Sequence, residues 1–259
     1  MTVTYEGLRT HSSLALQGMT SSEAGREVDD ITDIRQRFHR YDIRNGAVNI
    51  PSDSLYPHLK RASVLVPIFL KNQQWRILLT VRSHKLRTHT GSVALPGGLR
   101  DDSDVDEVDT AIREAEEEIG LLRRDVTVLA VLFPNIVRPG YIVFPVVAVI
   151  PSWFQARPNP DEVATVFDLP LDTFLHDFRV QNWSMFSIDI SIVHFPRFVD
   201  SVKMDIWGFT ARLCMWTANI VYNTGGTIGG LSDRRACAGD DVYSQHRFLF
   251  YYLCQHSRM

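Results

Sequence analysis

The sequence is poor in cysteine and has no cysteine pair with metal-ligand spacing. Its three cysteines, Cys214, Cys237 and Cys254, are spread along the last part of a 259-residue chain. We therefore expect free thiols in a reducing compartment rather than a disulfide framework or a zinc site. The N-terminal residues also lack the continuous apolar segment that a secretory signal needs, so no such signal is expected.

A long apolar run and a strong excess of one charge are missing as well. The longest apolar stretch, 142–154, is interrupted by Pro145 and Pro151 and is shorter than the ~20 residues of a spanning helix, so we expect no membrane span. Acidic and basic residues number 30 and 27, a near balance that argues against a nucleic-acid binder. With 45% hydrophobic residues, the chain can bury a sizeable core.

The apolar pattern divides the chain into three parts. We expect an N-terminal extension with a short helix, a mixed α/β (α+β) domain with a β-sheet between helices, and a glycine-rich insertion followed by a tail. Their bounds are residues 1–60, 61–222 and 223–259.

Several elements follow from residue spacing. The predicted short helix covers 30–41, after a loosely ordered start, and 51–57 is a connector. The valine- and isoleucine-rich runs 62–70 and 75–81 flank a polar turn and predict a hairpin. Thr210 is the expected N-cap of a helix over 210–222. Further strands are expected at 92–95, 126–133, 141–150 and 187–193, a helical turn at 169–175, and a flexible insertion at 225–239.

An acidic helix is the most informative segment. Apolar residues at steps of three and four over 105–119 predict a helix with one buried stripe, which Gly120 ends. Glu114, Glu117 and Glu118 fall on another face of this helix. Like charges at such spacing cost an isolated helix a few tenths of a kcal/mol each. The face is therefore either merely solvated or a site for a hard cation such as Mg²⁺.

Residues 113–121, R-E-A-E-E-E-I-G-L, resemble the second half of the Nudix box, G-x5-E-x7-R-E-U-x-E-E-x-G-U, where U is aliphatic. The first half differs, because Asp104 stands at the loop acid and one extra residue precedes Arg113; this leaves the role of the loop acid open. The resemblance implies a Nudix fold and metal-dependent hydrolysis of a diphosphate with Mg²⁺ or Mn²⁺. It implies metal binding by the three helix glutamates, a bracing role for Arg113, and a substrate turn at Gly97 and Gly98.

Residues 78–98, L-L-T-V-R-S-H-K-L-R-T-H-T-G-S-V-A-L-P-G-G, resemble the coenzyme A diphosphatase signature L-L-T-x-T-[SA]-x3-R-x3-G-x3-F-P-G-G. Arg82 and Leu95 replace the threonine and the phenylalanine. The implied substrate is coenzyme A or acyl-coenzyme A, with Arg82 and Arg87 as phosphate ligands. A solubilising basic loop is the alternative for these cations. Glu162 is either structural or a catalytic base.

Ser257-Arg258-Met259 resembles the peroxisomal C-terminal address S-K-L. It implies binding to the peroxisomal import receptor and a peroxisomal location, with the cytosol as the alternative. Two other functions stay open. One is a Nudix hydrolase for a different nucleoside diphosphate derivative, such as NADH or ADP-ribose, and the other is a non-catalytic nucleotide-binding Nudix module.

Overall fold

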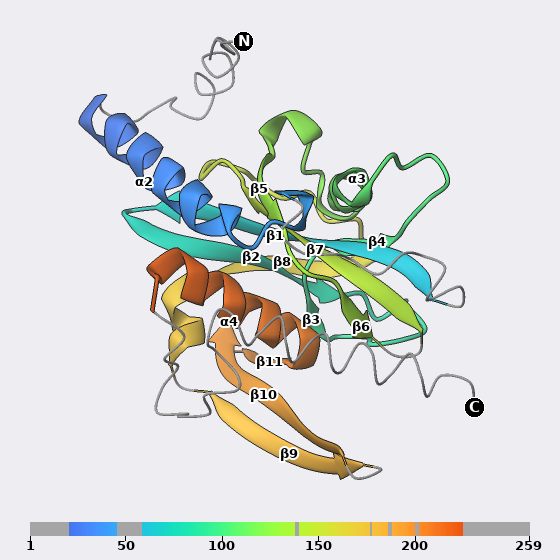
Figure 1. Ribbon diagram of the computed structural model, residues 1–259. Helices are drawn as coiled ribbons and strands as arrows, with labels where there is room; N and C mark the ends of the chain where they lie inside the picture. The colour runs from blue at the N-terminus through green and yellow to red at the C-terminus, as the bar shows by residue number, and fades with distance from the viewer. Residues whose placement is uncertain are drawn as a thin grey trace.

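A mixed eight-stranded sheet with helices on both faces forms the centre of the computed structural model (Figure 1). The structure describes residues 21–45, 59–137, 140–176, 178–185, 188–199 and 202–224. The expectations for residues before 21, for the connector at 51–57, for the insertion at 225–239 and for the last three residues fall outside these ranges. The expected sheet between helices is confirmed, because α3 and α4 cover opposite faces.

The main sheet has the order β3-β2-β1-β7-β5, with β4 paired to β1, β6 to β7 and β8 to β2. Only β1 and β7 run parallel among these pairs; all the others are antiparallel. The strands are β1 Lys60–Lys71, β2 Gln74–Arg82, β3 Val93–Ala94, β4 Gly97–Leu99, β5 Thr127–Val131, β6 Asn135–Val137, β7 Tyr141–Val149 and β8 Val163–Pro170.

The hairpin predicted from the two apolar runs is formed by β1 and β2. Asn72 and Gln73 join the strands with φ of 52° and 60°. Two consecutive positive φ values match the tight hairpin turn whose twist agrees with that of the flanking strands. In β1, the neighbours Leu65 and Val66 point to opposite faces and both are fully buried, so the sheet is covered on both sides.

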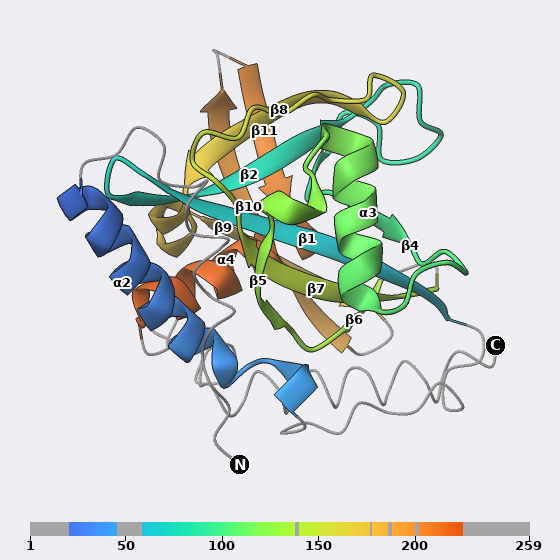
Figure 2. The same cartoon turned by 90° about the horizontal axis from the view of Figure 1, so that it is seen from above.

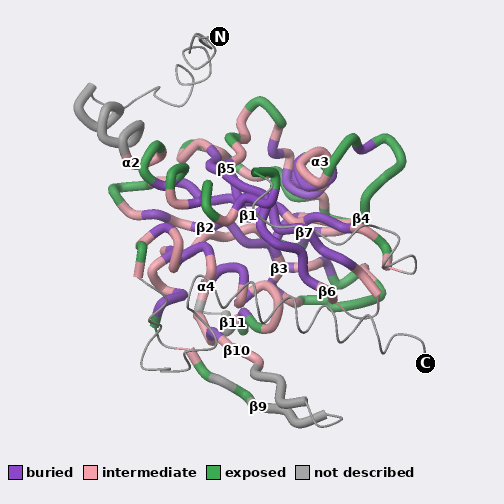
Figure 3. Tube along the Cα trace, in the orientation of Figure 1, coloured by how far each residue is buried: buried purple, intermediate pink, exposed green. Residues whose placement is uncertain are grey.

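Each face of the sheet carries its own core. On one face Leu65 and Phe144 pack with Ala115 and Ile119 of α3. On the other face the core includes Val66, Ile77, Phe174 and residues of α4. Figure 2 shows α3 crossing over β1 and β7, and Figure 3 shows these strands as the buried centre of the molecule. Packing against β1 and β7 therefore fixes the position of α3 on this face of the sheet.

Helix α3 spans Glu107–Ile119 and is shorter at its start than the predicted 105–119. Val105 lies outside the helix with 79% of its surface exposed. The helix starts two residues later because Asp106 is the N-cap, and its side chain accepts a hydrogen bond from the Asp109 N–H at 2.9 Å. Gly120 ends the helix in the left-handed conformation with φ 72°, as predicted.

The first described helix, α2, spans Ser21–His39 and so begins within the segment expected to be loosely ordered. Ile34 and Phe38 anchor it in the core, and the good helix formers Glu23, Ala24 and Arg26 can continue it outward. Short 3-10 turns follow at η1 Ile43–Asn45, η3 Arg123–Asp125 and η4 Leu171–Leu175. The last of these agrees with the helical turn predicted at 169–175.

A separate antiparallel sheet of β9 Arg179–Met185, β10 Ile188–Val199 and β11 Val202–Trp207 precedes α4 Gly208–Tyr222. Only β10 was expected. The prediction of Thr210 as N-cap is wrong: Trp207 is the cap residue, without a side-chain hydrogen bond, and the Thr210 hydroxyl donates to the Val93 carbonyl at 3.4 Å. Gly208, with φ 62°, lets the chain turn directly from strand to helix. None of the described helices is long and apolar enough to cross a membrane.

Candidate active site

Three glutamates from two distant parts of the chain meet beside the second half of α3. Glu114 and Glu118 lie one turn apart on the helix, and Glu162 precedes β8. One carboxylate oxygen from each lies within 4.8 Å of the other two. Glu118 is only 5% exposed. Three convergent carboxylates are the hard oxygen ligands that Mg²⁺ and Mn²⁺ prefer, so these residues fit a divalent cation. We call them the carboxylate cluster.

Glu117, the third glutamate predicted from the helix, is not part of this cluster. Its side chain is 52% exposed and forms an ion pair with the Arg113 Nη1 at 3.1 Å. A step of three keeps Glu117 on the same side of the helix as Glu114, but its carboxylate pairs with Arg113 and lies outside the three oxygens of the cluster. Glu162 takes the place beside them. Its only signal in the sequence is an acidic residue directly before an apolar strand, which does not reveal its neighbours.

The loop before β8 brings Glu162 to the helix. The Arg157 N–H donates to the Ile119 carbonyl and the Asn159 N–H to the Glu118 carbonyl, each at 2.8 Å. Carbonyls in the last turn of a helix have no partner within the helix, so the loop satisfies them. From the other side, the Ser83 N–H donates to the Glu162 carbonyl at 2.8 Å. The loop before β8 is thus hydrogen-bonded both to the end of α3 and to Ser83, the residue after β2.

The two glycines before α3 allow the backbone to approach the carboxylate cluster. A Cβ on Gly98 would lie 2.5 Å from the Glu114 carboxylate, and a Cβ on Gly97 would lie 2.3 Å from the Ser63 carbonyl oxygen. Gly97 also has φ 156°, and its N–H lowers the pKa of the Glu118 carboxyl group. The structure thus has Gly97 and Gly98 in strand β4 rather than in the predicted turn, and Gly98 lies directly against the cluster.

Replacing Gly98 with Ala is expected to weaken Mn²⁺ binding and turnover by about 10–100-fold, the usual effect of disturbing groups that orient metal ligands. The added methyl group must displace the Glu114 carboxylate. Gly140→Ala is the matched control, because a Cβ there meets nothing within 4 Å. Metal affinity measured by Mn²⁺ titration should fall for the first variant only; equal affinities would contradict the assigned role of Gly98.

Burial dominates the electrostatics of the cluster. Burial first, and then the charges of Glu114 and Glu162, raise the pKa of Glu118 to about 8, against the opposing effects of Arg82 and the Gly97 N–H. Burial also raises the pKa of Glu114, which Arg113 opposes. Without a cation, the Glu118 carboxyl group therefore resists ionisation at neutral pH.

The stability of the metal-free protein should consequently fall as pH rises. Between the ordinary glutamate value of 4.5 and about 8, the folded state binds more protons at Glu118 than the unfolded state does. The stabilisation is complete below pH 4.5 and is lost as pH rises through 8. Urea unfolding in EDTA at pH 5, 6, 7 and 8 measures this. As pH rises, the free energy of unfolding of wild type should fall steadily relative to that of Glu118→Gln. A difference in unfolding free energy that does not change with pH would refute this prediction.

Arg113 connects the helix to the loop before it. Its Nε and Nη2 contact the two carboxylate oxygens of Asp104 at 3.0 and 3.1 Å. Nη2 also donates to the Leu99 carbonyl at 2.8 Å and lies 3.1 Å from the Glu114 carboxylate. Asp104, whose role the altered box spacing left open, is thus the partner of Arg113. Their pairing lowers the pKa of Asp104 to about 2.

Of the predicted phosphate ligands, only Arg82 lies at the cluster. A β-bulge between Val81 and Arg82 interrupts the pairing of β2 with β8, and bulges often redirect a side chain next to an active site. Arg82 acts electrostatically on Glu118. Its Nε is buried and has no hydrogen-bond partner among the described residues. Arg87 is exposed without a described ion pair, and Lys85 pairs with Asp161 at 2.7 Å.

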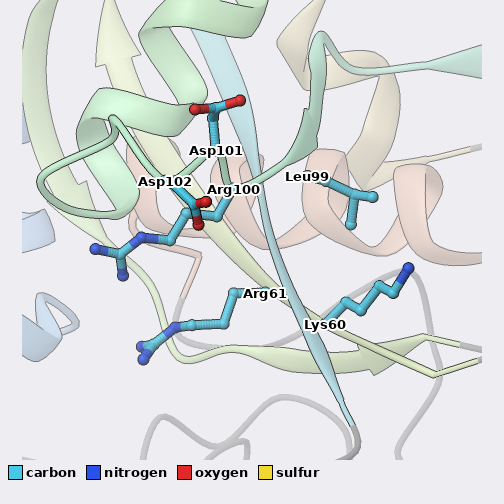
Figure 4. A pocket seen from close by; sticks show the side chains of 6 residues that line it. All are labelled: Lys60, Arg61, Leu99, Arg100, Asp101 and Asp102. Atoms are coloured by element: carbon cyan, nitrogen blue, oxygen red, sulfur yellow. The ribbon is translucent and has the colours of Figure 1, made fainter.

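A cavity of about 520 Å³ opens one residue beyond Gly98 (Figure 4). In Figure 4 Arg61 and Arg100 extend to one side and Lys60 to the other. Arg61 forms an ion pair with Glu107 at 2.7 Å. The cavity therefore combines basic and acidic groups beside the end of β4. Its lining is Lys60, Arg61, Leu99, Arg100, Asp101 and Asp102.

Comparison with known proteins decides the family. The NUDIX domain family model matches residues 59–186. The mouse peroxisomal coenzyme A diphosphatase NUDT7 is 40% identical over 197 residues, which cover 74% of this chain and 80% of the mouse protein. The chain belongs to the Nudix family. Its family and relatives make it a Nudix hydrolase, an enzyme that acts on diphosphate bonds, as the box resemblance predicted.

Other Nudix relatives differ in name and location. Nudix hydrolase 15, mitochondrial, from Arabidopsis thaliana is 39% identical over 168 residues, which cover 63% of this chain but only 59% of the plant protein. The uncharacterized Nudix hydrolase NudL of Escherichia coli K12 is 45% identical over 117 residues, covering 45% of this chain and 60% of NudL. Among solved structures, the Nudix hydrolase RenU from M. smegmatis is 24% identical with a TM-score of 0.39 and covers 44% of this chain and 72% of its own.

Proposed function

We propose that this Nudix hydrolase cleaves the diphosphate of coenzyme A or acyl-coenzyme A, giving 3′,5′-ADP and (acyl-)4′-phosphopantetheine. One observation carries the proposal: both ends of the segment that resembles the coenzyme A signature, Arg82-Ser83 and Gly97-Gly98, lie against the carboxylate cluster. If this segment served only to increase solubility, its two ends would not need to lie next to the acidic residues of the Nudix box. The mouse relative, named a coenzyme A diphosphatase, supports the same substrate.

In the proposed site, Glu114, Glu118 and Glu162 would hold the divalent cation, and the exposed Glu117 would bind a second ion only by exchanging its contact with Arg113. Bound Mg²⁺ or Mn²⁺ would neutralise charge on the phosphoryl oxygens and lower the pKa of the attacking water. Arg113 fixes the direction of Glu114 through their 3.1 Å contact. The ligand set is thus built on one helix and one loop.

The reaction itself is a displacement at phosphorus. A water oxygen bonds to one phosphorus, the bridging P–O bond breaks, and the leaving phosphate takes the electron pair. A carboxylate oxygen of Glu162 or Glu118 would accept the proton of the water. The half-buried Arg82 guanidinium binds a diphosphate oxygen, and the absence of side chains at Gly97 and Gly98 lets the diphosphate lie against the backbone. Arg87, which is exposed, is proposed to bind a phosphate farther from the reacting bond.

A substrate comparison tests the proposal. Coenzyme A, an acyl-coenzyme A, NADH and ADP-ribose are each incubated with the full chain and Mg²⁺ or Mn²⁺, and the products are identified by mass spectrometry. We expect the highest kcat/KM for the coenzyme A compounds. A higher kcat/KM for NADH or ADP-ribose would replace the coenzyme A assignment while leaving the Nudix chemistry in place. Binding of all four without turnover would favour the non-catalytic module.

We also propose import into peroxisomes through Ser257-Arg258-Met259 and the import receptor. The mouse relative is named a peroxisomal protein, which supports this location, while the Arabidopsis relative is named mitochondrial. A fluorescent protein fused to the N-terminus leaves the last three residues free. The fusion should colocalise with a peroxisomal marker, and deletion of these residues should leave it in the cytosol. Unchanged targeting after deletion would refute the proposal.

A further inference from the structure

Asn159 links the two parts of the chain that supply the carboxylate cluster. Its backbone N–H donates to the Glu118 carbonyl at 2.8 Å, and its backbone carbonyl accepts from the N–H groups of Glu162 and Val163 at 3.0 and 2.8 Å. Its side chain contacts Asp161 and Glu162. The polar groups of this one residue thus bond to Glu118 on one side and to residues 161–163 on the other.

The backbone contacts define a tight turn. Asn159 is the first residue, Pro160 the second and Glu162 the fourth, and the hydrogen bond from Glu162 to Asn159 closes it. Asparagine is favoured at the first position of such a turn, and proline supplies the φ of the second. Because the Asn159 N–H is bonded to the last turn of α3, the turn keeps a fixed position relative to Glu118. The place of the Glu162 backbone is therefore set by Asn159.

The side chain of Asn159 influences the direction of the Glu162 carboxylate. Its Oδ1 accepts from the Asp161 N–H at 3.2 Å, so the oxygen of the amide is engaged within the turn. The amide nitrogen must then face outward, where Nδ2 lies 3.5 Å from the Glu162 Oε1. At this length the hydrogen bond is weak. A weak contact to one of the two carboxylate oxygens adds little to the stability of the fold, but it favours one direction of the Glu162 side chain.

We propose that Asn159 is a positioning residue that holds the Glu162 carboxylate within the cluster and ties it to Glu118. The inference rests on the proposed function only in taking the cluster as the metal site. It concerns a residue outside the Nudix box and outside the coenzyme A signature. Groups that orient metal ligands typically contribute 10–100-fold to metal affinity or activity, which is the effect expected here.

A neighbouring contact provides the matched control. Lys85 and Asp161 form an ion pair across the same turn, but their side chains are 64% and 75% exposed. Exposed ion pairs contribute little to stability or geometry. Lys85→Ala therefore removes a neighbouring ion pair and leaves the Asn159 contacts in place, and it should bind Mn²⁺ with the affinity of wild type.

The test is a double-mutant cycle in the full chain with Asn159→Ala, Glu162→Ala and the combination of both. Mn²⁺ affinity is measured by electron paramagnetic resonance, and Mg²⁺-dependent turnover is measured with coenzyme A. We expect Asn159→Ala to weaken Mn²⁺ binding by about 10–100-fold. In the Glu162→Ala background the same change should have no further effect, because its target is absent. Equal effects in both backgrounds, or wild-type Mn²⁺ affinity in Asn159→Ala, would overturn the proposal.

A second variant separates positioning from folding. Asn159→Asp keeps the oxygen that accepts the Asp161 N–H and so keeps the turn, but it removes the donor and places a like charge beside Glu162. It should fold, as judged by circular dichroism, and lose activity at least as strongly as Asn159→Ala. Wild-type turnover in this variant would contradict the role. If wild type binds Mn²⁺ but does not cleave coenzyme A, the proposed substrate fails while the Mn²⁺ cycle still tests Asn159.

Discussion

Glu118→Gln should lower Mg²⁺-dependent hydrolysis of coenzyme A on the order of 10³-fold, because it removes a charged group on which stabilisation of the reacting phosphate depends. Glu118 is the most buried member of the carboxylate cluster, with 5% of its surface exposed. Glutamine keeps the shape of the side chain but offers a neutral oxygen in place of the carboxylate. The fold should therefore survive while cation binding fails. Steady-state kcat/KM, measured for both proteins at the Mg²⁺ concentration that saturates wild type, gives the effect.

Glu116→Gln is the control for this prediction. Glu116 lies on the same helix between Glu114 and Glu118, yet it is exposed and outside the cluster. The same chemical change at that position should leave kcat/KM within a factor of about two, as is usual for surface substitutions. Mg²⁺ should raise the stability of wild type and of Glu116→Gln but not that of Glu118→Gln. A fully active Glu118→Gln enzyme would remove the basis of the metal site.

The elements that sequence predicted well are those whose pattern is local. The β1–β2 hairpin follows from two apolar runs around a polar turn, and α3 follows from its stripe and from Gly120. Strands β4 and β6, with three residues each, are too short to show any period. Strands β9 and β11 depend on pairing with β10, which residue spacing alone does not reveal.

In the candidate site, too, the residues with a local sequence pattern could be predicted and those brought in by long-range contacts could not. The helix supplied Glu114 and Glu118 at a spacing that a sequence displays directly. Glu162 reaches them only because β8 pairs with β2 and the loop before β8 caps the end of α3. No repeating pattern of apolar and polar residues indicates that residues so far apart in the sequence come close together in the fold. The exclusion of Glu117 also needed the structure, since its pairing with Arg113 competes with the direction that the helix face suggested.

Asp104→Asn is expected to destabilise the protein by about 3 kcal/mol at pH 7, at the lower end for breaking one side of a buried pair. The Asp104 side chain is only 4% exposed and contacts two nitrogens of Arg113, which itself is 26% exposed. Without the carboxylate, Arg113 loses its anchor in the loop and holds Glu114 less firmly. We therefore expect weaker Mn²⁺ binding together with the loss of stability. Urea unfolding and Mn²⁺ titration measure the two effects.

The pH dependence identifies the cause of this destabilisation. Pairing with Arg113 lowers the pKa of Asp104 from 3.8 to about 2, so the folded state binds fewer protons there than the unfolded state. The stabilisation is complete above pH 3.8 and disappears as pH falls through 2. The difference in unfolding free energy between wild type and Asp104→Asn should therefore become smaller below pH 4. Asp102→Asn, at an exposed position of the same loop, should have the same unfolding free energy as wild type. A gap that stays constant down to pH 2 would mean that packing, and not the ion pair with Arg113, holds the loop against the helix.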